Sequence, residues 1–295
     1  MLTHQYAIAR SPKRVVVIGA GGFAGSAIVR QLKNAEIATE AITRKTVDLD
    51  AGDGAERLAT RLTPEDSVVF VSAVAPAKTV AQLMTNLRMA EAACRAFAHV
   101  PPAHLLYLSS DAVYADDANP VSESSAVAPS TLHGMMHAAR ELMFRSEYRG
   151  PFAVLRPTLI YGATDPHSGY GPNRFRRQAA NGEPVSIFGE GEEKRDHVAV
   201  EDVARLAVRI LTHRSSGSLN AVTGVSTPFS AIARLVAGHF VPPAEVRSIP
   251  RPGPRPHLLH RFFDITECHK AFPDFHFEPI GDGLARVHRE AAERP

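Results

Sequence analysis

Residues 14–25 read Arg-Val-Val-Val-Ile-Gly-Ala-Gly-Gly-Phe-Ala-Gly, and this stretch decides the fold. The apolar, β-branched run over residues 15–18 is typical of a strand buried on both faces, as strands of a parallel sheet are. Glycines follow at once, and apolar residues then recur at helical spacing over residues 23–32. The stretch therefore predicts a strand, a tight turn and a helix in direct succession.

Three glycines of this turn, Gly19, Gly22 and Gly25, form the pattern G-x-x-G-x-x-G. Glycine adopts backbone angles that are closed to other residues. It also lets a diphosphate approach the main chain at the positive end of the following helix. Because the pattern lies between a predicted strand and a predicted helix, we interpret it, together with Phe23, as the phosphate loop of a dinucleotide-binding domain.

Strands and helices continue to alternate along the chain. Further strands are predicted over residues 40–43, 67–72, 104–109 and 152–155, and further helices over residues 55–61, 80–97, 131–145 and 174–180. Within residues 131–145, one apolar stripe is formed by Leu132, Met136, Ala139 and Met143. This order predicts an α/β fold, a Rossmann-type doubly wound parallel sheet with right-handed crossovers.

The texture of the sequence changes beyond Tyr161, where proline and glycine become frequent and the predicted helices become shorter. We therefore expect an NAD(P)-binding Rossmann domain over residues 13–162. A smaller substrate-binding region, interleaved with the first, is expected over residues 163–295.

Composition and charge exclude several classes of partner. The 295 residues carry a formal net charge of only +2, with scattered basic residues, so no nucleic-acid partner is expected. The two cysteines, Cys94 and Cys268, cannot build a disulfide framework. Residues 1–14 lack the apolar core of a signal peptide, and no run of about 18 apolar residues predicts a membrane span. We expect a cytoplasmic protein with a small-molecule substrate and no membrane partner.

The residues after the second predicted strand bear on the choice of nicotinamide. An acidic side chain there would bind the ribose 2′-hydroxyl of NAD. About 20 residues beyond the phosphate loop the chain instead reads Thr43-Arg44-Lys45, and Arg44 and Lys45 suit the 2′-phosphate of NADP. Glu40 is the acidic alternative if the strand ends earlier. We predict NADP as the preferred cofactor, with NAD as the alternative.

Several further segments, taken in order, resemble the extended short-chain dehydrogenase/reductase family, and within it the NAD-dependent epimerase/dehydratase branch that handles nucleotide sugars. The resemblance covers residues 13–284. After the phosphate loop, the matching segments are Asp48-Leu49, Val71-Ser72-Ala73, Asn86, Ser109-Ser110-Asp111-Ala112-Val113-Tyr114, Arg156-Pro157, Tyr161-Gly162, Gly189-Glu190-Gly191 and Arg195-Asp196-His197-Val198-Ala199-Val200-Glu201-Asp202-Val203-Ala204.

This resemblance implies roles on the cofactor side. Asp48 and Leu49 would bracket the adenine, and Ser72 and Ala73 would lie beside the cofactor. Asn86 matches the family's structural asparagine and is counted with the cofactor-binding residues.

It also implies roles on the reaction side. Ser110 takes the catalytic Ser/Thr position, with Asp111 beside it among the substrate-binding residues. Arg195 would meet a diphosphate of a nucleotide sugar, because a planar guanidinium matches phosphate oxygens. The alternative is an ion pair of Arg195 with Asp196 or Glu201.

Two further groups are implied on the substrate side. Asn173 and Arg174 open a predicted helix where the family also contacts substrate. Arg261 lies with Arg251 and Arg255 in a Pro-rich region. These arginines line an anionic substrate pocket or belong to a solvated surface.

The chain departs from the family at its catalytic pair, Tyr-x-x-x-Lys. In the family the tyrosine is the acid/base, and the lysine lowers the tyrosine pKa and holds the nicotinamide ribose. Here His133 takes the tyrosine position and His137 the lysine position. Neither Tyr114 nor Tyr148 is followed four residues later by lysine, so no shift of alignment restores the pair.

Three interpretations of the two histidines stay open. In the first, His133 is the acid/base, because imidazole titrates near neutral pH; Ser110 would bind the reacting oxygen and His137 the ribose. In the second, catalysis is lost and the fold only binds a dinucleotide or a partner. In the third, the pair binds metal from one helix face, but no clear third ligand follows, and we predict no metal site.

The expected function is an NAD(P)-dependent epimerase, dehydratase or reductase that acts on a nucleotide sugar or related polar substrate, with His133 in place of the tyrosine. The alternative is a catalytically silent dinucleotide-binding protein that senses redox state or scaffolds a partner. The resemblance also implies a homodimer that pairs through the helix carrying His133.

Overall fold

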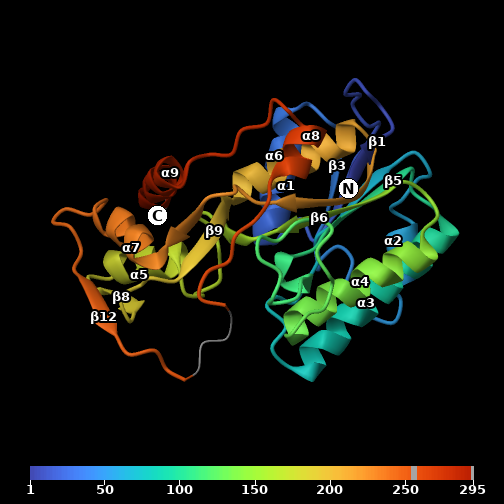
Figure 1. Ribbon diagram of the computed structural model, residues 1–295. Helices are drawn as coiled ribbons and strands as arrows, with labels where there is room; N and C mark the ends of the chain where they lie inside the picture. Colours follow the sequence, from blue (N-terminus) through green and yellow to red (C-terminus); the bar gives the residue numbers. More distant parts are fainter. Residues whose placement is uncertain (254–257, 294–295) are drawn as a thin grey trace.

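The computed structural model describes residues 1–253 and 258–293 (Figure 1). Arg255, one of the arginines considered for a substrate pocket, lies outside the described residues. Within the described residues, none of the helices combines the length and the apolarity needed to cross a bilayer.

A seven-stranded sheet forms the larger lobe, on the right of Figure 1. Its strands, in spatial order, are β1 (Leu2–His4), β10 (Ser215–Ala221), β6 (Phe152–Pro157), β5 (His104–Leu108), β4 (Ser67–Phe70), β2 (Val15–Ile18) and β3 (Thr39–Ile42). Every neighbouring pair is parallel except β1 with β10. The predicted doubly wound parallel sheet is confirmed.

Helices cover both faces of this sheet, because its strands present buried residues in both directions. Val15 and Val17 pack under α1 (Phe23–Asn34) and α6 (Val200–Thr212). The alternate residues, Val16 and Ile18, belong to a second core beneath the other layer of helices. That layer comprises α2 (Gly54–Ala59), α3 (Val80–His99) and α4 (Leu132–Glu147). Such two-sided burial follows from the two-residue period of a strand.

The smaller lobe, on the left of Figure 1, has its own core. One small sheet joins β7 (Leu159–Tyr161), β9 (Lys194–Ala199) and β11 (Ser226–Pro228), and another joins β8 (Val185–Phe188) and β12 (Val246–Ile249). Its helices are α5 (Pro172–Ala180), α7 (Phe229–Ala237) and α9 (Ile280–Ala292). The two lobes are interleaved in sequence, because β10 returns to the large sheet after β8 and β9.

Two further short elements pack against the large lobe. The 3₁₀ turn η1 (Asp111–Val113) follows β5, and α8 (Thr266–Ala271) packs beside β10 and β1. Strand β6 extends through Arg156 and Pro157, two residues farther than predicted. Pro157 is tolerated there because it pairs only with Ala221 on β10, while the pairing with β5 ends at Leu155.

Candidate functional site

The turn between β2 and α1 requires glycine at two positions. Gly19 has φ of 99°, and a Cβ there would lie 2.6 Å from the Ser72 backbone nitrogen. A Cβ on Gly25 would lie 2.2 Å from the Gly19 carbonyl oxygen. Gly22 caps α1, is exposed and has no side chain to occupy the helix N-terminus. Because these glycines have no side chains, the turn leaves room for a diphosphate at the positive end of α1. Phe23 is the first residue of this helix.

The far end of this site lies just beyond β3. Arg44 is 80% exposed, and its Nε donates to an Asp48 carboxylate oxygen at 3.1 Å. A backbone hydrogen bond from Asp50, followed by Arg44, lowers the pKa of Asp48. Lys45 is exposed and Leu49 is buried. The loop after β3 begins with Thr43. The next residue, Arg44, is a cation and not a carboxylate.

Glu40, the acidic alternative, lies within β3 and is occupied elsewhere. Its carboxylate lies 3.3 Å from Arg61 Nη1 and 3.9 Å from Arg14 Nη1. These ion pairs join the strand to its neighbours in the large lobe and leave the end of β3 to Thr43 and Arg44.

Asn86 shapes the wall of the site from behind. Its side-chain amide donates to the carbonyls of Val74 and Gln82 at 2.9 and 2.8 Å, and its Oδ1 accepts from Val74 N at 3.0 Å. The buried Asn86 therefore holds the stretch that contains Ser72 and the exposed Ala73, both predicted to lie beside the cofactor.

Arg140 on α4 supports the same wall and was not anticipated from the sequence. Its guanidinium is completely buried and donates to the carbonyl oxygens of Ser72 at 2.8 Å and Asn86 at 2.6 Å. It also lies over the Phe70 ring, 5.3 Å from the centroid. Burial lowers the pKa of Arg140. Because guanidinium stays protonated in proteins, α4 carries a buried positive charge behind the site.

The contact between η1 and α4 brings the turn that Ser110 begins close to the helix that carries His133. A Cβ on Gly134 would lie 2.0 Å from the Ala112 carbonyl oxygen, so α4 approaches η1 at backbone distance. Thr131 caps α4 by accepting from Gly134 N at 3.1 Å. Ser110 Oγ accepts from Ala112 N at 3.1 Å and lies 3.5 Å from an Asp111 carboxylate oxygen.

His133 is an uncharged imidazole in this arrangement. Its Nδ1 is buried with no hydrogen-bond partner among the described residues. Burial, followed by the electrostatic influence of His167 and Arg140, lowers the pKa of His133 to about 4. At neutral pH the ring is therefore deprotonated, and no carboxylate of the described residues orients its Nδ1.

His137 lies one turn farther along α4 and is buried. Its Nδ1 is 2.7 Å from the Tyr107 hydroxyl, and its ring stands edge-on to His133 with centroids 4.7 Å apart. Burial, together with His133 and Arg140, holds the pKa of His137 well below its usual range. No group of three or more potential ligands gathers anywhere in residues 1–253 and 258–293, so the metal interpretation gains no third ligand.

A buried ion pair that sequence reasoning also missed ties α4 to the sheet. Arg156 Nη2 donates to a Glu141 carboxylate oxygen at 2.6 Å, and Ser109 Oγ donates to the same carboxylate at 2.6 Å. Arg156 Nη1 donates to the Tyr114 hydroxyl at 2.8 Å. The ends of β5 and β6 are thereby fixed relative to α4. Glu141 lies at helical spacing from His137, which is the sequence signal for its shared face.

Two residues predicted to bind substrate, Arg195 and Asn173, have their polar groups paired with other residues of the protein. Arg195 is buried, lies 2.8 Å from a Glu193 carboxylate oxygen and donates to the Leu258 carbonyl at 2.6 Å. Its ion-pair partner is thus Glu193, and not Asp196 or Glu201. The amide of Asn173 donates to Asp165, while its oxygen accepts from Gly162 N at 3.4 Å.

Other arginines lie against an aromatic ring in the small lobe. The guanidinium carbons of Arg174 and Arg251 lie 5.9 and 4.9 Å from the centroid of Phe188. Phe188 in turn stacks on Tyr170 with centroids 4.5 Å apart. No sequence pattern pointed to Phe188, because it reads as an ordinary strand residue.

Arg261 returns from the C-terminal segment to the residue beside Ser110. Its Nη2 donates to the Asp111 carbonyl at 3.4 Å, and its Nε lies 3.8 Å from the Asp111 carboxylate. The structure thus brings two predicted substrate-binding residues together next to η1.

His167 crosses from the small lobe to the wall of the site. Its Nδ1 is 2.7 Å from an Asp165 carboxylate oxygen, and its Nε2 is 2.8 Å from the Ala75 carbonyl. The segment after Tyr161 therefore lies close to the stretch that follows β4.

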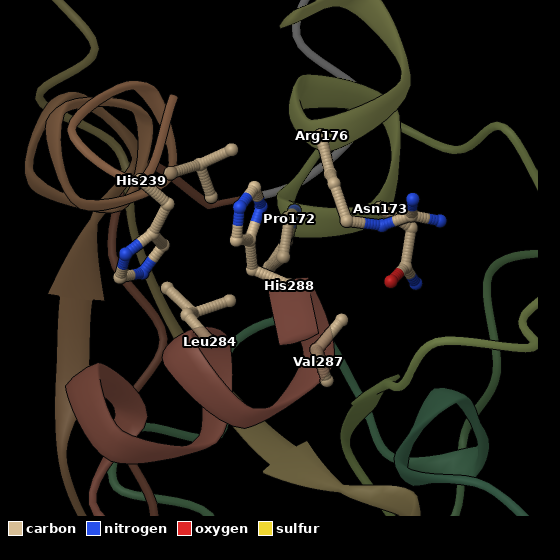
Figure 2. Close-up of a pocket in the computed structure, with 8 residues that line it drawn as sticks. Pro172, Asn173, Arg176, His239, Leu284, Val287 and His288 are labelled. Atoms are coloured by element: carbon tan, nitrogen blue, oxygen red, sulfur yellow. The ribbon is translucent and has the colours of Figure 1, made fainter. Parts of the chain in front are cut away.

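A separate small cavity lies within the small lobe. Figure 2 shows His239 and His288 beside Pro172, Asn173 and Arg176, and the two imidazoles stack with centroids 5.4 Å apart. The cavity has room for no more than about one water molecule, so it is too small for a substrate.

Known proteins share this architecture. A dTDP-4-dehydro-6-deoxy-D-allose reductase from Streptomyces bikiniensis is 27% identical over 154 residues, which cover 50% of this chain and 45% of the relative. The chain is thus matched over about half the length of this curated relative. A GDP-L-fucose synthetase from Naegleria fowleri bound to NADP is similar in structure, with a TM-score of 0.86, 14% identity and coverage of 99% and 98%. A UDP-glucose 4-epimerase from Thermus thermophilus in complex with NAD has a TM-score of 0.80, 22% identity and coverage of 95% and 99%.

A family model decides the assignment. The model of the NAD dependent epimerase/dehydratase family matches residues 15–222, which run from the strand that precedes the phosphate loop to the end of β10. The resemblance read from the motifs is confirmed, and the chain belongs to the NAD dependent epimerase/dehydratase family.

Proposed function

We propose that this protein is an NADP-preferring oxidoreductase or epimerase that acts on the sugar of a nucleotide sugar, with His133 as its acid/base. The observation that carries the proposal is the contact at Gly134, which seats the helix of His133 directly against the turn of Ser110. A bound nicotinamide supplies hydride transfer at a hydroxyl or carbonyl carbon. The glycine cradle before α1 fits the diphosphate of such a cofactor.

The residues of the chain divide the remaining work. Ser110 lies at the start of η1, and in this proposal its hydroxyl binds the reacting oxygen. His133 exchanges the proton that accompanies hydride transfer, which is the task of general acid/base catalysis. Arg140 and Asn86 hold the wall formed by residues 72–74, so that the cofactor site stays in one shape.

The preference for NADP rests on the end of β3. Arg44 and Lys45 follow Thr43 there, and Glu40 is held in ion pairs within the lobe. A guanidinium matches the oxygens of a 2′-phosphate. One structural relative is bound to NADP and another to NAD, so the family fold accepts both.

A nucleotide-sugar substrate is supported by the small lobe and by the relatives. Arg174 and Arg251 flank Phe188, which combines positive charge with an aromatic face. Such a surface suits the phosphates and the base of a nucleotide. The relatives are named for dTDP-, GDP- and UDP-linked sugars. In this proposal residues 13–162 bind the cofactor and residues 163–295 supply most substrate contacts.

The decisive experiment compares His133→Asn with His239→Asn, a histidine of the small cavity. NADPH binding is measured by fluorescence, and turnover is measured with a panel of keto and hydroxy nucleotide sugars. We expect His133→Asn to lower kcat by about 10²-fold or more, the usual share of general acid/base catalysis, without weakening NADPH. We expect His239→Asn to behave as the unmodified protein does.

The pH dependence sharpens this test. The protonated fraction of a donor with a pKa of about 4 falls about tenfold for each pH unit above that value. We therefore expect kcat/KM for carbonyl reduction to fall about tenfold per unit between pH 5 and 7, and this fall to vanish in His133→Asn. A profile that is flat over this range contradicts His133 as the donor.

A catalytically silent dinucleotide-binding protein is the second candidate, and one observation favours it. His133 is uncharged, and its Nδ1 has no partner in the described part of the chain, unlike an imidazole oriented for catalysis. Tight NADPH binding with no turnover across the panel would establish this second function. Failure to bind either nucleotide contradicts both candidates.

A further inference from the structure

Tyr107 lies behind the two histidines and belongs to no known motif of the site. It stands on β5, is completely buried and packs its ring against Phe70 and Phe144. Its hydroxyl meets two groups of α4. One is His137 Nδ1 at 2.7 Å, and the other is the guanidinium of Arg140, whose positive charge acts on the hydroxyl.

The direction of the hydrogen bond between Tyr107 and His137 follows from what each group can do. Guanidinium has donors and no acceptor, so Arg140 cannot accept the proton of the Tyr107 hydroxyl. Burial raises the pKa of Tyr107 far above its usual value, so the hydroxyl keeps its proton. The acceptor that the structure places beside that proton is His137 Nδ1. The opposite direction would leave a buried O–H without an acceptor next to a cation.

The consequence falls on the other nitrogen of His137. The ring is uncharged, because its pKa lies well below the usual range, so a ring that accepts at Nδ1 carries its one proton on Nε2. The Nε2 atom makes no hydrogen bond within the described residues, and the buried polar atoms that lack a partner do not include it. Nε2 therefore belongs to the 6% of the His137 surface that is exposed, beside His133.

We propose that Tyr107 is a positioning residue that fixes His137 as the Nε2–H tautomer, so that this N–H donates to the nicotinamide ribose where the family has a lysine. The ribose contact rests on the proposed function, whereas the tautomer does not. The lysine's two properties are then divided between two side chains. His137 supplies the hydrogen bond, and Arg140 supplies the positive charge from its fixed place on the Ser72 and Asn86 carbonyls.

The test is the tautomer itself, read from ¹⁵N chemical shifts of the histidine rings in the full chain without cofactor. His137 is assigned by the signal that disappears in His137→Gln. We expect an unprotonated Nδ1 and a protonated Nε2 in the unmodified protein, and a mixture of both tautomers in Tyr107→Phe. A proton on Nδ1 in the unmodified protein overturns the proposal, even if Tyr107→Phe does not fold.

Tyr148→Phe is the matched control. Tyr148 belongs to the same core, is buried and donates its hydroxyl to the Pro102 carbonyl at 2.8 Å, away from the histidines. We expect it to leave the His137 signals unchanged. Equal changes in both variants would mean that the core is loosened in general, which contradicts the specific role of Tyr107.

The ribose contact has its own readout, the dissociation constant of NADPH. We expect Tyr107→Phe to weaken NADPH in inverse proportion to the fraction of His137 that remains the Nε2–H tautomer, about twofold for an even mixture, and Tyr148→Phe to leave it unchanged. Unchanged affinity in Tyr107→Phe, with the tautomer shifted, overturns the ribose contact alone. Failure of the unmodified protein to bind NADPH overturns the proposed function, while the spectrum still decides the tautomer.

Discussion

In the proposed function, single residues just beyond β3 determine how the adenosine ribose of the cofactor is recognised. Arg44 is the second residue after the strand, is mostly exposed and pairs with Asp48. Arg44 could be identified from the sequence, because the prediction depends only on the number of residues between Arg44 and the phosphate loop. That Glu40 is unavailable could not be predicted, because its partners Arg14 and Arg61 lie far away in the sequence.

The first prediction replaces this arginine. In Arg44→Gln the side chain keeps most of its length and loses its charge, so we expect NADPH to bind about tenfold more weakly, the size of one charge-assisted hydrogen bond. NADH has no 2′-phosphate and should bind as before. Fluorescence titration of both nucleotides measures the difference.

The control for this variant is Arg95→Gln. Arg95 is an exposed arginine of α3 that pairs with Glu56 at 2.5 Å, and it lies outside the loop after β3. It should leave both affinities unchanged. Equal weakening of NADPH and NADH by Arg44→Gln would show that Arg44 does not distinguish the two.

At the scale of an element, α4 shows that hydrophobic periodicity alone does not predict which face of a helix is buried. The predicted stripe of Leu132, Met136, Ala139 and Met143 includes one fully buried residue, Met136. The face that is buried instead carries His137, Arg140, Glu141 and Phe144. A hydrophobic pattern cannot find such a face, because buried charges depend on partners from other elements.

The contact between α4 and η1 gives the second prediction. Gly134→Ala places a methyl group 2.0 Å from the Ala112 carbonyl oxygen, a backbone atom that cannot turn aside. We expect α4 to move away from η1, which separates His133 from Ser110. Overpacking of this kind costs about 1–3 kcal/mol. Thermal unfolding should show a lower Tm, and kcat should fall about tenfold or more, as for small misplacements in an active site.

A second helical glycine supplies the comparison. A Cβ on Gly281 in α9 meets no atom within 4 Å. Since alanine favours helix over glycine by up to about 1 kcal/mol, Gly281→Ala should keep or raise Tm and leave kcat unchanged. If Gly134→Ala behaves in the same way, the close approach of α4 to η1 has no part in the activity.

At the scale of the whole molecule, buried imidazoles make the fold sensitive to acid. Burial lowers the pKa of His104, His133 and His197 to about 4, and it holds that of His137 well below 6.5. Between these values and 6.5, these four histidines bind protons in the unfolded chain and not in the folded protein. Burial raises the pKa of Asp196 to about 6, so the folded protein binds one extra proton below that pH. Because the unfolded chain binds more protons in total, stability falls as pH decreases from 6.5 towards 4.

The third prediction follows from this balance. A net difference of up to three protons corresponds to a decrease of about 3–4 kcal/mol in the free energy of unfolding for each unit by which the pH falls. Urea denaturation at pH 7.5, 6.5 and 5.5 will measure this decrease. His104→Gln keeps a donor for the Ser215 carbonyl, which His104 Nε2 contacts at 2.8 Å, and removes one titrating group. Its loss per pH unit should therefore be smaller. A loss that is the same in His104→Gln contradicts the assignment to buried imidazoles.

Five strands of the large sheet, β2 to β6, were predictable from the sequence, whereas β1, β10 and the strands of the small lobe were not. Buried parallel strands such as β2 and β4 read as continuous apolar runs. Strands β8 and β12 are short, only partly buried and lie among prolines and glycines, so no pattern distinguished them. The arrangement of Arg174 and Arg251 around Phe188 depends on this lobe and was equally hidden.

The late return of β10 to the large sheet has a consequence for the order in which the protein is made. A ribosome delivers β2 to β6 first, yet β6 pairs with β10, whose last residue is Ala221. Helix α6, which packs beside α1, also comes late. Until these residues emerge, one side of β6 and the apolar face beneath α1 stay uncovered. The nascent chain therefore carries an incomplete cofactor site through the synthesis of β7, α5, β8 and β9, the part of the small lobe that precedes β10.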